Sequence, residues 1–160
     1  MKKANNVEIT SQEIANWFLS RISMSPKKLQ KMLYYAYSWV LTLTNDSSDH
    51  IENKLFNDSF EAWAHGPVLM DIYHHYKDCG YNNIPKYEGK VVKLPDEIDD
   101  ILNQVIDVYG KYTADQLESI THQESPWINA RKDLSPLESS NNMISDQDIF
   151  SCYIKRVSED

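Results

Sequence analysis

The chain has 160 residues, of which 41% are hydrophobic and 25% charged, and this apolar content suffices for one domain with its own core. Its 24 acidic and 16 basic side chains give a formal charge of −8, which excludes a strongly basic nucleic-acid-binding protein as the default interpretation. Residues 1–44 carry a net charge of +4 and residues 45–160 a net charge of −12. We therefore predict a single domain over residues 1–160 whose uneven charge steers it toward a charged partner.

The cysteine usage and the absence of apolar segments point to a cytoplasmic protein. Cys79 and Cys152 lie far apart and form no C-x-x-C motif, which suits a reducing compartment. The N-terminal residues contain no apolar signal core, and the uncharged stretch at residues 32–43 is too short to cross a bilayer. We expect a soluble intracellular protein without membrane association.

Helix start signals divide the chain into six or seven helices. Each signal is a capping box or a serine followed by proline, which satisfies the free amides of a first helical turn. These signals lie at Thr10–Glu13, Ser25–Pro26, Thr113–Gln116, Ser125–Pro126 and Ser145–Asp148. We further expect an acidic helix start at Pro95, with the helix ending at Gly110.

The helix expected at residues 26–44 is the candidate for the centre of the fold. No charged residue occurs between Lys31 and Asp46, so neighbouring elements must enclose most of this helix. Two short alternating segments, at residues 60–64 and 90–94, are the only strand candidates. The sequence thus predicts a mainly α fold, a compact bundle around a central helix with a small two-stranded antiparallel ribbon.

Motifs for cofactor or metal chemistry are missing. The sequence contains no glycine-rich phosphate loop, no nucleophile elbow and no H-E-x-x-H motif. A helix expected over residues 68–79 places Asp71, His75 and Cys79 on one face, but nothing nearby completes a metal site, so a helix surface with a half-buried thiol is the simpler interpretation. We expect no metal and no cofactor.

A basic cluster at the start of the central helix has three interpretations. Lys27, Lys28 and Lys31 could contact phosphates of DNA, with Tyr34 and Tyr35 just beyond them. They could also meet an acidic partner protein, or simply form a solvated first turn. Given the acidic remainder of the chain, nucleic acid is not the expected partner.

Two further segments combine aromatic, acidic and histidine residues. Residues 60–67 contain Trp63 and His65 before a Gly-Pro turn, and residues 121–131 contain His122, Trp127 and Arg131. One interpretation is a partner-binding surface, because Trp, Tyr and Arg anchor interfaces. Another is a single hydrogen-bonded network that fixes helix registers, formed by Glu61, His65, His122, Glu124 and Arg131.

A catalytic interpretation of the same segments needs a nucleophile beside a base. Cys79 or Ser125 could be paired with His65 or His122, but no local motif supports either choice. A hydrolase of this kind requires the two imidazoles to converge in one pocket. We expect a protein that is not an enzyme.

Three motifs carry a family resemblance. Residues 28–36 read Lys-Leu-Gln-Lys-Met-Leu-Tyr-Tyr-Ala, residues 60–68 contain Phe-Glu-Ala-Trp and His-Gly-Pro-Val, and residues 121–131 contain Thr-His-Gln-Glu, Pro-Trp and Ala-Arg. In this order and spacing they resemble the Panacea domain, the SocA-like antitoxin family with phage-associated GepA-like members. The resemblance covers about residues 12–155.

The resemblance implies a small helical antitoxin domain without enzymatic activity, from a prophage or mobile element. Such a domain binds and blocks a cognate toxin protein, usually encoded beside it, and the SocA type also delivers its toxin to a Clp-type protease. Alternatives are a phage-encoded inhibitor of a host protein, a proteolysis adaptor and a DNA-binding regulator; the sequence does not define the oligomeric state. The predicted partner-binding residues are Lys27, Lys28, Lys31, Tyr34, Tyr35, Trp63, His65, His122, Trp127 and Arg131.

Overall fold

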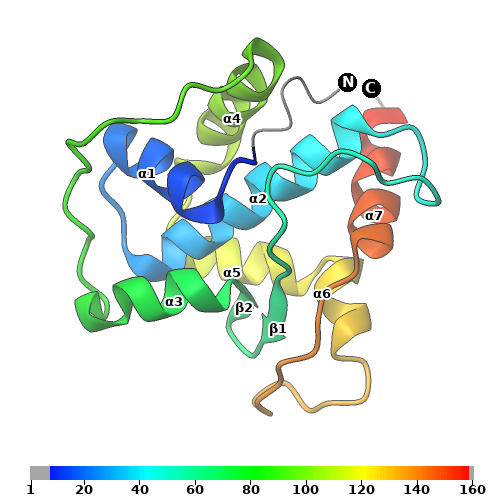
Figure 1. The fold of residues 1–160 in the computed structure, drawn as a ribbon. Coiled ribbons are helices and arrows are strands. Elements are labelled where there is room, and N and C mark those ends of the chain that lie inside the picture. Colours follow the sequence, from blue (N-terminus) through cyan, green and yellow to red (C-terminus); the bar gives the residue numbers. More distant parts are fainter. Residues whose placement is uncertain (1–7, 159–160) are drawn as a thin grey trace.

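The computed structural model describes residues 8–158, which form a mainly helical fold (Figure 1). Its elements, in chain order, are α1 (Ser11–Arg21), α2 (Pro26–Thr44), β1 (Glu61–Trp63), β2 (Gly66–Val68), α3 (Met70–Tyr76), the 3-10 helix η2 (Lys77–Cys79), α4 (Asp96–Tyr109), α5 (Ala114–His122), α6 (Ser125–Ala130) and α7 (Asp146–Ser158). The predicted fold class, helices with a small antiparallel ribbon, is confirmed. Across residues 8–158, every helix is too short or too polar to cross a bilayer.

Helix α2 lies at the centre of the fold, as predicted for residues 26–44. It contacts α1, α3, α4, α5, α7 and β2, and Figure 1 shows these elements arranged around it. Ser25 caps the helix by accepting a hydrogen bond from the backbone N–H of Lys28. Fourteen of its nineteen residues are buried, which explains why no charged side chain follows Lys31.

Aromatic side chains of α2 form much of the core. The ring of Tyr35 stacks on Tyr109 of α4 with centroids 4.0 Å apart, and Tyr34 meets Phe60 edge to face at 5.3 Å. The indole N–H of Trp39 donates to the Tyr109 hydroxyl at 2.9 Å. Aromatic pairs of this kind contribute about 0.5–1.5 kcal/mol each beyond their buried area. The Tyr35–Tyr109 stack therefore helps to hold α4 against α2.

The helix ends follow the predicted capping signals, with one shift. Both capping boxes are present, at Thr10 with Glu13 and at Thr113 with Gln116. The start of α6 differs, because Glu124 is its N-cap residue and Ser125 is already helical. The Ser125 hydroxyl is therefore not the cap.

The antiparallel ribbon is a tight hairpin, and its predicted second strand at residues 90–94 is wrong. Trp63 in β1 pairs with Gly66 in β2, and residues 90–94 are irregular. Gly66 adopts φ +115°, a value that favours glycine, so the chain reverses where a break was predicted. The other edge of β1 is also occupied, because the Ala62 N–H donates to the Asn142 carbonyl at 2.8 Å.

The helix predicted over residues 68–79 is shorter than expected. The strand β2 takes its first residue, α3 begins at Met70, and the last turn tightens into η2. Gly80 ends this segment with φ +58°, in the left-handed region, as its predicted role as a helix stop requires.

Candidate partner-binding surface

Two of the three lysines at the start of α2 are held by other parts of the protein. Lys27 Nζ pairs with the carboxylates of Asp115, at 2.8 Å, and Glu118 on α5. Lys28 Nζ donates to the carbonyl of Gly110 at 2.6 Å, at the C-terminal end of α4 where a cation is favourable. These contacts dock α2 against α4 and α5, and they leave no row of free ammonium groups for phosphates.

Lys31 is buried, so the prediction that it lies on a partner-binding surface is wrong. Only 1% of this residue is exposed, and its side chain lies beneath β2. A Cβ atom added at Gly66 would lie 2.6 Å from Lys31 Cε and 3.2 Å from the Thr121 hydroxyl, so only glycine fits between them. Burial lowers the pKa of Lys31 to about 7, and the charge of Lys27 acts in the same direction.

The same correction applies to Tyr34 and Tyr35, which are fully buried. The Tyr35 hydroxyl donates to Glu124 at 3.1 Å, and burial followed by the negative charge of Glu124 raises the pKa of Tyr35 far above its ordinary value. Both residues lie on an enclosed helix, where their rings fill the core. They are not available to a partner.

The motif around residues 121–131 is also largely structural. The imidazole of His122 stacks on the Trp127 ring with centroids 3.9 Å apart, and the Trp127 indole N–H donates to the Trp63 carbonyl at 2.8 Å. Burial lowers the pKa of His122 although the charge of Glu118 opposes it, and this favours the neutral imidazole. Trp127 is 9% exposed and joins α6 to the hairpin, where a partner cannot reach most of its ring.

Arg131 is buried rather than exposed and organises the loop after α6. One guanidinium nitrogen donates to the Ala62 carbonyl in β1 at 2.8 Å. The other donates to the carbonyls of Ser135, at 3.1 Å, and Glu138, at 2.6 Å. Arg131 thereby joins residues 132–142 to the hairpin, and its predicted place at a partner interface is wrong.

The single hydrogen-bonded network proposed for the motif acids, histidines and arginine is not present. Glu124 accepts hydrogen bonds from the hydroxyls of Tyr35 and Tyr153 and from Arg156, which joins α2, α6 and α7. Arg131 instead binds backbone carbonyls. The acids and arginine therefore act at separate places in the fold.

The two histidines have different surroundings. The side chain of His65 is 74% exposed, and its Nδ1 lies 3.3 Å from a carboxylate oxygen of Glu118. Among residues 8–158, neither His65 nor His122 forms a hydrogen bond with a serine, threonine or cysteine side chain. Within that same range, no three His, Cys, Asp or Glu side chains are grouped to hold a metal ion.

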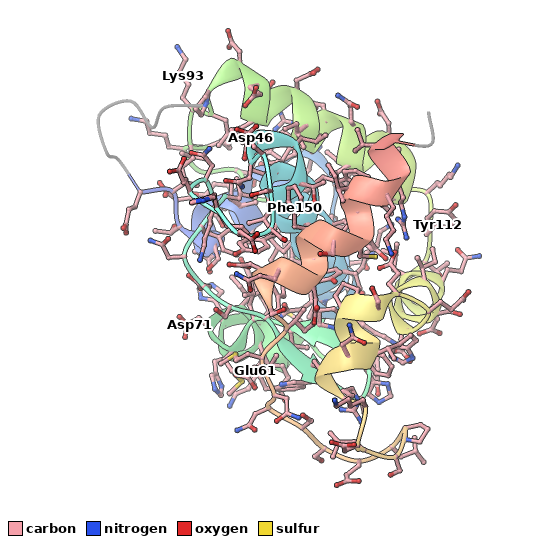
Figure 2. The ribbon with its side chains drawn as sticks, turned by 90° about the vertical axis from the view of Figure 1, so that its right-hand side faces the viewer. Asp46, Glu61, Asp71, Lys93, Tyr112 and Phe150 are labelled. Atoms are coloured by element: carbon pink, nitrogen blue, oxygen red, sulfur yellow. The ribbon has the colours of Figure 1, made fainter. Side chains whose placement is uncertain are left out.

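A concave, partly aromatic surface remains beside the hairpin, and we call it the hairpin pocket. It has a volume of about 720 Å³ and lies between β1, the start of α3 and the loop after α6. Its lining residues are Glu61, Trp63, Ala64, His65, Met70, Leu137, Ser139, Ser140 and Asn141. Figure 2 labels Glu61 near the foot of the molecule, close to the loop that joins α6 to α7.

Local contacts hold the aromatic wall of this pocket in place. The Trp63 indole N–H donates to the Glu61 carboxylate at 3.0 Å, and the Trp63 ring packs on Tyr73 with centroids 4.9 Å apart. Met70 is 36% exposed and Leu137 88% exposed, so the pocket offers apolar side chains to a partner. Such an arrangement of a fixed aromatic ring among accessible apolar groups is typical of protein interfaces.

Of the ten predicted partner-binding residues, Trp63 and His65 line the hairpin pocket. Glu61, Met70 and Leu137 also line it, but they were not among the predicted partner-binding residues. The alternation of polar and apolar residues in the predicted strand could have identified Glu61, because Glu61 and Trp63 lie on the same face of a strand. No local signal identifies Leu137, since long-range contacts decide where its loop lies.

Comparison with family models decides which family this fold belongs to. Residues 29–128, more than half of the chain, match the model described as "Antitoxin SocA-like, Panacea domain". The chain belongs to this family. No curated protein and no solved structure gives a significant match.

The part of the chain that matches the Panacea domain contains the hairpin but not the whole hairpin pocket. It includes Gly66 of the hairpin together with Lys31 and Trp127, which contact the hairpin. It ends before Arg131 and the loop that carries Leu137. The pocket of this Panacea-domain protein therefore has two walls. The wall that carries Trp63 lies inside the matched segment, and the wall that carries Leu137 lies outside it.

Proposed function

We propose that this protein is an antitoxin that neutralises a cognate toxin protein by direct association and without enzymatic activity. The toxin is encoded next to it in a prophage or mobile element, and the complex forms in the cytoplasm. Membership in the SocA-like antitoxin family supports the class of function.

The observation that carries the proposal is the hairpin pocket. Trp63 is held by Glu61 and Tyr73 while Met70 and Leu137 remain accessible beside it. A rigid aromatic anchor loses little conformational entropy when a partner covers it, so such residues dominate binding energy. The motif lysines and tyrosines of α2 are paired or buried within the fold, so the hairpin pocket is the better candidate.

Co-expression tests the proposal directly. The product of the neighbouring gene is expected to stop growth alone, to permit growth together with this protein, and to co-purify with it. Trp63→Ala should reduce both rescue and co-purification, whereas Tyr81→Ala should not, because Tyr81 is 97% exposed and does not line the hairpin pocket. A harmless neighbour, or a toxic one that neither binds nor is neutralised, contradicts the proposal.

Delivery of the toxin to a Clp-type protease is the second step that the SocA-like family membership suggests. The same strains test it, because the half-life of the toxin should then depend on both this protein and the protease. An unchanged half-life in a strain without Clp would limit the function to direct blocking.

A further inference from the structure

The hairpin pocket contains a carboxylate without a cationic partner. Glu61 and Trp63 share the outward face of β1, since Ala62 between them is fully buried. The carboxylate accepts one hydrogen bond, from the Trp63 indole at 3.0 Å. Within residues 8–158, no lysine, arginine or histidine nitrogen lies within 4.0 Å of it.

The other groups in the pocket do not neutralise this charge. His65 is the one other titratable residue in the lining, and its imidazole lies against Glu118. Met70 and Leu137 are apolar, and the remaining loop residues are neutral. The pocket therefore combines one negative charge, an aromatic ring and aliphatic walls.

An apolar side chain alone would fill this pocket poorly. Covering Glu61 without a counter-ion would remove water from its carboxylate, and an uncompensated buried charge is costly. An acidic side chain would add repulsion. A cation with an apolar stem would satisfy both the carboxylate and the walls.

We propose that the hairpin pocket receives an arginine side chain from the toxin, an inference that rests on the proposed function. A guanidinium is planar, so it can lie over the Trp63 ring while it donates two hydrogen bonds to Glu61. Its methylene stem would pack against Met70 and Leu137. Arginine is preferred over lysine, because an ammonium is more strongly hydrated and cannot form the paired hydrogen bonds.

Peptide titration tests the pocket without the toxin. The probes are blocked tripeptides of sequence Leu-Arg-Leu, Leu-Lys-Leu and Leu-Gln-Leu, followed through the indole N–H signals of the four tryptophans. The Trp63 signal, assigned with Trp63→Phe, should move most with the arginine peptide and least with the glutamine peptide. Equal shifts for the three peptides, or no shift at millimolar concentration, would overturn the proposal.

Glu61→Gln is the decisive variant, and Glu97→Gln is its matched control. The glutamine keeps an oxygen for the Trp63 indole but removes the charge. Glu97 is an exposed acid on α4 outside the pocket. Glu61→Gln should abolish the preference for the arginine peptide, whereas Glu97→Gln should leave it unchanged; a preference that survives Glu61→Gln overturns the proposal.

Binding to the purified toxin separates this inference from the proposed function. Glu61→Gln should weaken the toxin complex about tenfold at low salt and reduce its salt dependence. If the toxin binds and is neutralised but Glu61→Gln has no effect, the arginine inference fails and the antitoxin function stands. If the wild-type protein binds no toxin, the proposed function fails, and the peptide titration alone decides the chemistry of the pocket.

Discussion

The buried ammonium of Lys31 should make the stability of this protein rise with pH. Its pKa falls from the ordinary 10.5 to about 7 in the folded protein, first because of burial and then because of Lys27. The unfolded chain therefore binds more protons than the folded protein between pH 7 and 10.5. Below about pH 7 the full cost of burying the Lys31 ammonium reduces the free energy of unfolding. This cost decreases as pH rises from 7 to 10.5.

The magnitude follows from the two pKa values. At 1.36 kcal/mol per pH unit, a shift from 10.5 to about 7 corresponds to a full penalty of about 5 kcal/mol. Between pH 7 and pH 9 the free energy of unfolding should rise by about 2 kcal/mol from this residue alone. Burial of the Lys31 ammonium thus lowers the stability of the folded protein at neutral pH.

Lys31→Met removes the charge and keeps an unbranched chain of similar length. We expect it to increase the free energy of unfolding by about 2–4 kcal/mol at pH 7. The measurement is urea unfolding at pH 6, 7, 8 and 9, where the gain should shrink as pH rises. Comparing the variant with the wild type at each pH cancels the other titrating groups.

Lys93→Met is the control, because Lys93 is exposed and labelled on the outer surface in Figure 2. Its stability profile should run parallel to that of the wild type. If the Lys31→Met profile were also parallel to the wild type across this range, the ammonium would not be held at a lowered pKa, and the reasoning would be refuted.

Three further changes probe the contacts that build the hairpin and its supports. Glu124→Gln leaves two buried tyrosine hydroxyls and an arginine with a weaker acceptor. Urea unfolding should show that the free energy of unfolding falls by about 2–4 kcal/mol. Gly66→Ala places a side chain on a backbone with φ +115° and brings its Cβ against Lys31 Cε. We therefore expect the free energy of unfolding to fall by about 2–4 kcal/mol in the same assay. Arg131→Met frees four backbone carbonyls, and it should raise hydrogen exchange in residues 132–142 and weaken binding to the proposed toxin.

Each of these changes has a matched control elsewhere in the chain. Glu97→Gln removes an exposed acid, Gly80→Ala places a Cβ in open space at φ +58°, and Lys132→Met changes the exposed neighbour of Arg131. Glu97→Gln and Lys132→Met should cost about 1 kcal/mol or less. Gly80→Ala shares the positive φ of Gly66 but meets no neighbouring atom, so it should cost less than Gly66→Ala. Equal losses in variant and control would mean that the contacts named above do not carry the stability assigned to them.

The helices could be predicted because their signals are local. The capping boxes at Thr10 and Thr113 satisfy amides within the same turn, so no distant contact is needed to place them. The central helix could be predicted for a similar reason, since a long uncharged stretch with helical spacing must be enclosed. The fold class followed from these elements.

The ribbon and the site depended on contacts that no local pattern encodes. The Gly66–Pro67 pair predicts only the end of a strand. In the structure, the positive φ of Gly66 lets the chain reverse and begin the second strand of the hairpin. The three lysines of α2 were predicted to be accessible, either to a partner or to solvent. In the structure α4 and α5 supply acceptors for Lys28 and Lys27, and the hairpin covers Lys31. Whether a helix face is exposed is decided by what packs on it, and that information lies far away in the sequence.

The uneven charge of the chain now has a structural explanation and a consequence for binding. Three of the six cations in the positive segment are held within the protein, because Lys27 pairs with α5, Lys28 donates to the end of α4 and Lys31 is buried. Acidic side chains such as Glu61, Glu97 and Asp100 have no ion pair among residues 8–158. The formal charge of −8 predicts a negative field around the protein, which should speed the approach of a basic surface on the proposed toxin. The association rate with the toxin should accordingly fall as salt increases, and a rate independent of salt would contradict this view of the surface.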